Sequence, residues 1–134
     1  MSPQVMLDAN IVSALMRDPL GSLRKRIEAR GEGAICISIV VSAELHFGAS
    51  KNPSARGLAN FERILHGLAV VPLASPVDEH YGRLRAHLQR GGRPIGPNDI
   101  WIAAHALTLG LILVTANVRE FSRVPGLIVE NWLD

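Results

Sequence analysis

Short apolar runs rich in β-branched residues alternate with longer helical patterns along the entire chain. Four runs have the length and composition of buried strands, and a weaker fifth follows near the end: Gln4–Leu7, Ala34–Val41, Ala69–Leu73, Leu111–Thr115 and Leu127–Glu130. Between them lie helical patterns at Asn10–Met16, Pro19–Arg30 (ended by Gly31 and Gly33), a segment capped by Ser42, Asn52–His66, Pro76 to the Gly91–Gly92 pair, and Asp99–Leu109. This alternation predicts an α/β fold with a parallel sheet wrapped by helices.

Length and composition bound the class of protein. The 134 residues, 48% apolar and 19% charged, suit one folded domain rather than a disordered tail. No apolar run reaches the ~18 residues of a membrane span, and the lone Cys36 allows neither an internal disulfide nor a cysteine-based zinc site. We therefore expect one cytoplasmic domain over residues 1–134, with Cys36 as a small core residue.

Acidic and amide side chains fall where the predicted strands end. Asp8 follows the first strand, Glu44 lies just inside the helix after the second, and Asn117 follows the fourth. Asp99 begins the helix that leads into the fourth strand. Ligands of open α/β sheets bind at the carboxyl ends of strands, where the strand order reverses. We expect these four side chains to converge there.

Such a cluster of hard oxygen ligands suits Mg²⁺ or Mn²⁺ better than zinc. Unpaired carboxylates in a partly desolvated cleft repel one another, and a divalent cation relieves that repulsion. The ion also polarises a phosphoryl oxygen and lowers the pKa of a bound water, which is the chemistry of phosphodiester hydrolysis.

Each of these residues also has an ordinary structural explanation. Asp8 is suited to cap a helix, and Asp99 to favour a helix dipole. Glu44 stands at the second position after the Ser42 cap, where first-turn charges are common, and Asn117 suits a turn. All four explanations must hold together for the predicted cluster to be accidental.

Several blocks of the sequence resemble a known family. The blocks that carry the resemblance are Met6–Asn10, Ser42–Gly48, Pro94–Ala106, Val114–Phe121, Val124–Leu127 and Glu130–Trp132. They are similar to those of PIN-domain ribonucleases and, more narrowly, of the VapC toxins of bacterial toxin–antitoxin pairs.

The resemblance implies a single α/β/α sandwich, with a four- to five-stranded parallel sheet, that acts as an Mg²⁺- or Mn²⁺-dependent endoribonuclease. It implies Asp8, Glu44 and Asp99 as the acidic, metal-holding residues. It also implies an antitoxin partner, a homodimer and an RNA substrate, with the anticodon loop of initiator tRNA as the closest match. An antitoxin arginine inserted among the acids would displace the cation.

The chain departs from the family pattern after the last core strand. Many relatives carry a fourth acidic residue there, whereas this chain has Asn117, with Glu120 three residues later. Either side chain could orient a metal-bound water, and we expect one well-held ion. Thr115 and Asn10 are candidates for supporting hydrogen bonds to the acids, although a strand terminus and a first helical turn explain them equally well.

Histidines are weaker candidates for chemistry. His105 is six positions beyond Asp99 and His46 two beyond Glu44, so both are expected to point away from the acids.

The basic residues favour a nucleic-acid substrate. Twelve of the fourteen are arginines, which bind phosphate bidentately. A GC-rich genome explains the same bias. With aromatic residues at 4%, a folded RNA fits better than a stacked single strand.

Two other functions remain as alternatives. An aspartyl phosphotransferase would use Asp8, but Asn10 replaces its second acid and no lysine follows the later strands. A receiver domain fails for similar reasons. A non-catalytic PIN-like interaction module is the other alternative, and the retention of Asp8 and Asp99 argues against it. The helices Leu20–Arg30 and Asn52–His66 are hypothetical docking surfaces for a partner.

Overall fold

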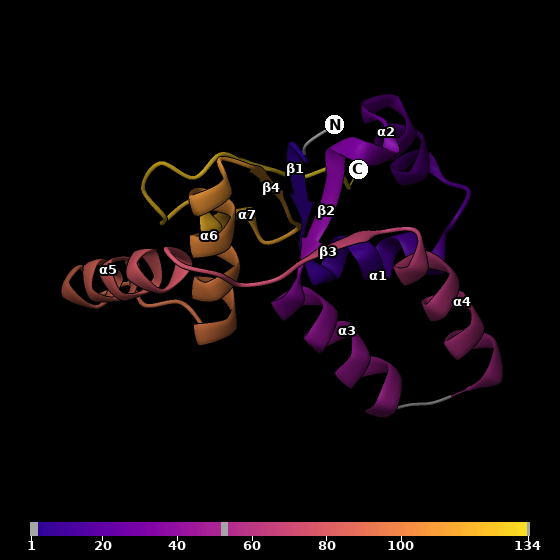
Figure 1. Ribbon diagram of the computed structural model, residues 1–134, viewed down its shortest axis with the longest axis horizontal. Coiled ribbons are helices and arrows are strands. Elements are labelled where there is room, and N and C mark those ends of the chain that lie inside the picture. Colours follow the sequence, from indigo (N-terminus) through magenta and orange to yellow (C-terminus); the bar gives the residue numbers. More distant parts are fainter. Residues whose placement is uncertain (1–2, 52–53, 134) are drawn as a thin grey trace.

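The computed structural model describes residues 3–51 and 54–133 and contains one sheet of five parallel strands (Figure 1). The strands are β1 (Val5–Leu7), β2 (Ile35–Ser38), β3 (Ala69–Val71), β4 (Ile112–Val114) and β5 (Val129–Glu130). Their order across the sheet is β3-β2-β1-β4-β5. The predicted parallel sheet of four to five strands is confirmed, and the weak fifth strand exists as a two-residue edge.

Helices flank this sheet. They are α1 (Ala9–Arg17), α2 (Ser22–Arg30), α3 (Ile39–Lys51), α4 (Ala55–His66), α5 (Val77–Arg90), α6 (Pro97–Leu109) and α7 (Val118–Phe121), with a short 3₁₀ turn at Glu32–Ala34. In Figure 1, α3 and α4 extend together below the sheet, past the carboxyl end of β2, while α5 lies against α6 at the left.

The strand order reverses beside β1. From β1 the chain moves outward through β2 to β3, then crosses back and adds β4 and β5 on the other side of β1. Met6 therefore pairs with Cys36 on one side and with Leu113 on the other. The crevice outside the carboxyl ends of β1 and β4 is the topological switch point, where open α/β sheets bind ligands.

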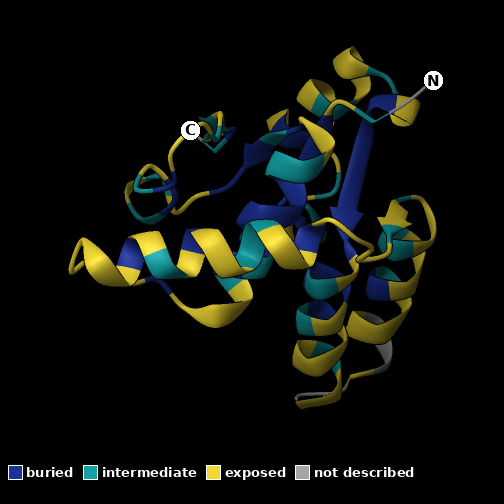
Figure 2. Ribbon diagram, turned by 60° about the vertical axis from the view of Figure 1, so that its left-hand side comes forward, coloured by how far each residue is buried: buried dark blue, intermediate teal, exposed yellow. Residues whose placement is uncertain are grey.

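The core follows the sheet. Every residue of β1 and β2 is buried, as Figure 2 shows in dark blue, while the outer faces of the long helices are exposed. Cys36 is 0% exposed, and burial raises the pKa of its thiol to about 11, so the expectation of a small core residue is confirmed. Within the described residues, no helix combines the length and apolarity needed to cross a membrane.

The prediction for the second strand and its helix was wrong at their boundary. Residues Ile39–Val41 are β-branched and were expected to continue the strand, but they form the first turn of α3. The side-chain oxygen of Ser38 accepts a hydrogen bond from the Val40 N–H at 3.1 Å. Ser38 rather than Ser42 thus caps α3, and Glu44 lies in its second turn. Capping and packing outweigh the strand propensity of this run.

Other boundaries shift by a few residues. Pro19 lies in a turn, and α2 begins at Ser22; Gly33 lies within the 3₁₀ turn instead of ending a helix. Helix α6 begins at Pro97, two residues before Asp99, because proline is well suited to a first helical position. The expected start of a helix at Asn52-Pro53 lies outside the described residues; Ser54 caps α4 through the Gly57 N–H.

Truncation of one leucine in the central sheet tests this packing. Leu113 of β4 is 0% exposed, so Leu113→Ala should lower the free energy of unfolding by about 2–5 kcal/mol. The same change at Leu20, which is 75% exposed, should alter it by less than ~0.5 kcal/mol. Urea denaturation of the isolated chain measures both; equal losses would contradict the burial assigned to β4.

Candidate active site

Asp8 lies at the switch point and is 5% exposed. It directly follows β1, and its N–H continues the ladder to β4 by donating to the Val114 carbonyl at 2.9 Å. It is also the N-cap of α1, since its Oδ1 accepts from the Ala9 N–H at 2.9 Å. The capping explanation and the predicted place at the sheet edge therefore hold together.

Two further side chains fix the other oxygen of Asp8. The Thr115 hydroxyl, at the end of β4, donates to Asp8 Oδ2 at 2.7 Å, and Asn10 Nδ2 lies 3.3 Å from the same oxygen. Asn10 in turn accepts from the Ala116 N–H at 3.0 Å, and Thr115 Oγ1 accepts from the Asn117 N–H at 3.0 Å. This network spans both strands of the switch point and orients the Asp8 carboxylate.

Glu44 approaches the site from α3. Burial and the charge of Asp8 raise the pKa of its carboxyl, while a hydrogen bond with the Asn98 side chain lowers it. Its Oε1 is buried and has no hydrogen-bond partner among the described residues. Asn98 was missed as a site residue in the sequence; its signal was its place beside Asp99 in the first turn of α6.

Asp99 and Glu120 form the other side of the site. Asp99 stands in the first turn of α6 and interacts with Glu120 of α7. The Gly96 N–H lies 3.4 Å from Glu120 Oε1, and the Asn117 side-chain amide donates to Glu120 Oε2. Asn117 thus forms a hydrogen bond with Glu120 directly. The two residues considered as replacements for the fourth acidic residue of the family therefore belong to one cluster.

The electrostatics of the cluster follow from its composition. Burial, together with the hydrogen bond and charge of Glu120 and the charges of Asp8 and Glu44, raises the pKa of Asp99 to about 7. Burial also raises the pKa of Asp8, and Glu120 adds to that rise. Four carboxyl groups from four separate segments therefore resist ionising together, which is the condition a divalent cation relieves.

The donor atoms of the site are of the type that a divalent cation such as Mg²⁺ binds. All the groups are hard oxygens, and the buried Oε1 of Glu44 lacks, among the residues described, the hydrogen bond that such an atom normally makes. Over residues 3–51 and 54–133, no three Asp, Glu, His or Cys side chains stand close enough to share one ion directly. Mg²⁺ commonly takes only one or two carboxylates and fills its remaining positions with water, so a tighter cluster is not required.

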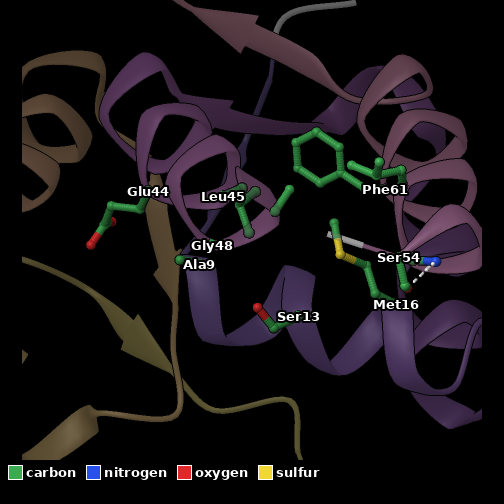
Figure 3. A pocket seen from close by; sticks show the side chains of 11 residues that line it. Ala9, Ser13, Met16, Glu44, Leu45, Gly48, Ser54 and Phe61 are labelled. Atoms are coloured by element: carbon green, nitrogen blue, oxygen red, sulfur yellow. Dashed lines mark hydrogen bonds between the residues drawn. The ribbon is translucent and has the colours of Figure 1, made fainter. Parts of the chain in front are cut away.

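Two hollows meet at Glu44. The smaller hollow, of about 360 Å³, lies between α1, α3 and α4, and Ser13, Met16 and Phe61 are among the residues that line it (Figure 3). In Figure 3, Glu44 is at the opposite end from Phe61, with its carboxylate directed outward. The larger hollow, of about 730 Å³, lies between α3 and the start of α6 and is lined by Phe47, Trp101 and Asn98, among others.

The histidines lie as expected. His46 packs edge-on against Phe61, with ring centroids 5.0 Å apart, and His105 bonds to Ser38 in the interior. Of the two hypothetical docking helices, α4 lines the smaller hollow through Gly57, Leu58 and Phe61, together with its cap Ser54, whereas α2 does not. Their role in docking stays a prediction.

Comparison with known proteins identifies the family. The PIN domain family matches residues 5–127. The tRNA(fMet)-specific endonuclease VapC of Shigella flexneri is 42% identical over 128 residues, which span 95% of this chain and 96% of that protein. Ribonuclease VapC2 of Haemophilus influenzae is also 42% identical, over 130 residues that span 96% and 97% of the two chains.

Solved structures agree with the sequence matches. The DNA-bound VapBC of Salmonella typhimurium superposes with a TM-score of 0.91 at 36% identity and covers 98% of this chain and 99% of that chain. VapBC2 of Rickettsia felis, bound to a DNA fragment from its promoter, gives 0.90 at 34% identity, with 96% and 98% covered. Shared sequence and fold along nearly the whole length show that this chain belongs to the PIN-domain family, within its VapC group.

Proposed function

We propose that this chain is a divalent-metal-dependent endoribonuclease and the toxin of a toxin–antitoxin pair that acts in the cytoplasm. The observation that carries the proposal is the meeting of Asp8, Glu44, Asp99 and Glu120 at the switch point of the sheet. The names of the VapC relatives support RNA as the substrate. The tRNA(fMet)-specific relatives of Shigella flexneri and Salmonella typhimurium favour initiator tRNA as the substrate, and we place the cut in its anticodon loop.

In this proposal Asp8, Glu44 and Asp99 hold one Mg²⁺ or Mn²⁺ between them, at most two of them directly and the rest through waters bound to the ion. When bound, the ion supplies Lewis-acid stabilisation of the charge that develops on the scissile phosphate. Thr115 and Asn10 keep the Asp8 carboxylate in one orientation. Asp99 carries a proton for much of the time near neutral pH and must release it before it can act as an anionic ligand. Asn117 and Glu120 orient the attacking water.

Charge outside the site favours RNA. The chain has a formal net charge of +2, so the residues other than the three proposed ligands together carry +5. Such a surface attracts phosphate although the pocket itself is acidic. The alternative of an aspartyl phosphotransferase gains no support, because such an enzyme needs a lysine near the strand ends to hold phosphate. Lys51 lies at the far end of α3 and Lys25 in α2, away from the ends of β1 and β4.

The smaller hollow suits the antitoxin. Its walls are mainly apolar or small side chains from three helices, and Glu44 stands at one end. An extended or helical segment with apolar side chains could fill it and direct an arginine toward the acids. That arginine would satisfy the same negative charge as the cation and so inhibit the enzyme.

The larger hollow suits a second copy of the chain. Phe47 is 67% exposed, Ile39 43% and Leu73 36%, and together they form an apolar rim beside Trp101. Exposed apolar clusters of this kind mark interaction surfaces. We assign this face to the homodimer, which would enclose the proposed sites between two copies.

Loss of either central carboxylate tests the nuclease assignment. Asp8→Asn and Asp99→Asn should each lower Mg²⁺- or Mn²⁺-dependent cleavage of folded RNA by more than about 100-fold, because each removes a charge that holds the cation. Asp78→Asn, an exposed change in the first turn of α5, serves as control and should cleave normally. Equal cutting by the wild type and both site variants would rule out these roles and favour an interaction module.

The raised pKa of Asp99 predicts a pH dependence. Between pH ~4 and ~7 the folded chain holds a proton on Asp99 that the unfolded chain has released, so the metal-free protein should lose stability as pH rises through this range. Mg²⁺ competes with that proton, so thermal stabilisation by Mg²⁺ should be larger at pH 8 than at pH 5.5. Asp99→Asn should weaken both trends, whereas equal Mg²⁺ stabilisation at the two pH values would contradict this role.

Charge placed on the apolar rim tests the dimer. Phe47→Glu should convert the dimer to monomer in light scattering coupled to size-exclusion chromatography, since two copies would bury like charges against apolar side chains. Ile128→Glu, at an apolar residue 62% exposed outside the rim, should leave the assembly unchanged. A wild-type monomer, or a Phe47→Glu dimer of normal stability, would refute the assigned face.

A further inference from the structure

A buried hydrogen-bonded link joins the helix that carries Asp99 to the start of the helix that carries Glu44. The hydroxyl of Ser38, the residue before α3, accepts from the Val40 N–H at 3.1 Å. The same hydroxyl oxygen lies 2.9 Å from Nδ1 of His105 in α6. Ser38 is 0% exposed and His105 1%, so the two side chains are closed off from solvent. We refer to this pair as the Ser38–His105 link.

The link favours one tautomer of the histidine. A hydroxyl has a single hydrogen, and a buried hydroxyl hydrogen needs an acceptor. Pro72 has no backbone N–H, so its hydrogen bond with His105 needs an N–H from the ring. Since Nδ1 faces Ser38, that N–H is on Nε2, and the serine donates to Nδ1. Burial lowers the pKa of His105, although a hydrogen bond with the backbone of Pro72 opposes the shift, which agrees with a neutral ring.

The link acts on the relative position of two proposed metal ligands. Glu44 is six residues beyond Ser38 in α3, and Asp99 is six residues before His105 in α6. The Glu44 carboxyl forms a hydrogen bond with the Asn98 side chain of α6, and its Oε1 has no partner within the part of the chain that the structure describes. The position of this carboxyl therefore depends on how α3 lies against α6. A small rotation or slide of α3 against α6 would therefore change the separation of Glu44 from Asp99.

We propose that His105 is a positioning residue of the nuclease: through Ser38 it holds the first turn of α3 against α6 and so sets the spacing of Glu44 and Asp99. The histidine touches neither RNA nor cation in this role. The inference rests on the proposed function, because the spacing of the two carboxylates matters only to the reaction that they serve.

Kinetics of folded variants test the role. His105→Leu should lower kcat for RNA cleavage by about 10- to 100-fold with little change in KM, because a misplaced ligand impairs the reaction more than RNA binding. His105→Asn retains an acceptor for the serine hydroxyl and should recover most of the loss. His87→Leu, the same change at an exposed position of α5, is the matched control and should cleave normally. All assays are run well below the melting temperature of each variant.

A double-mutant cycle tests whether the two side chains act together. Ser38→Ala should reproduce the kcat loss of His105→Leu, and the double variant should be no slower than the slower single one. Additive losses, a folded His105→Leu enzyme with normal kcat, or an Asn variant no better than the Leu variant would each overturn the proposal.

Nitrogen NMR of labelled histidine provides a readout independent of cleavage. Near neutral pH, His105 should show an unprotonated Nδ1 and a protonated Nε2, and Ser38→Ala should change its signals. A ring protonated on Nδ1 would overturn the link as described. If the wild type cleaves no RNA with any divalent ion, the proposed function fails, while the NMR result still decides whether the link exists.

Discussion

The pairing of β1 with β4 is the constraint on which the rest of the site depends. It places the residue after β1 next to the residue after β4, so that Thr115 can donate to Asp8 at 2.7 Å across 107 positions of sequence. The strand order reverses at this pair, which leaves space for α1 and α6 to begin on either side of a crevice. The site therefore arises from the topology of the sheet more than from any single motif.

Burial at this point has an electrostatic consequence. A carboxylate within the carboxyl edge of a sheet loses water, and each further carboxylate makes ionisation harder. Asp8 compensates with three hydrogen-bond donors, from Ala9, Asn10 and Thr115. Asp99 lies against Glu120 instead and has the most strongly raised pKa of the cluster. The two carboxyls are thus unequal: hydrogen bonds oppose the rise in the pKa of Asp8, whereas Glu120 adds to the rise in the pKa of Asp99.

Much of this was predictable from sequence, for physical reasons. The buried strands are short apolar runs with turn residues at their ends, and parallel pairing brings their carboxyl ends to one edge, so the approach of Asp8 and Asp99 could be anticipated. The start of α3 could not, because Ile39–Val41 suit a strand and only the capping hydroxyl of Ser38 and its buried partner decide otherwise. The contact of Asn98 with Glu44 depends on the relative position of two helices, which no local pattern encodes.

The distance in sequence between the two halves of the site has a consequence for synthesis. The ribosome releases β1 first, but its neighbour β4 and the hydroxyl that orients Asp8 lie 107 residues later. A nascent chain therefore cannot assemble the crevice before β4 has left the exit tunnel. Until then Asp8 lacks the hydroxyl that orients it, and the proposed site is incomplete on the ribosome.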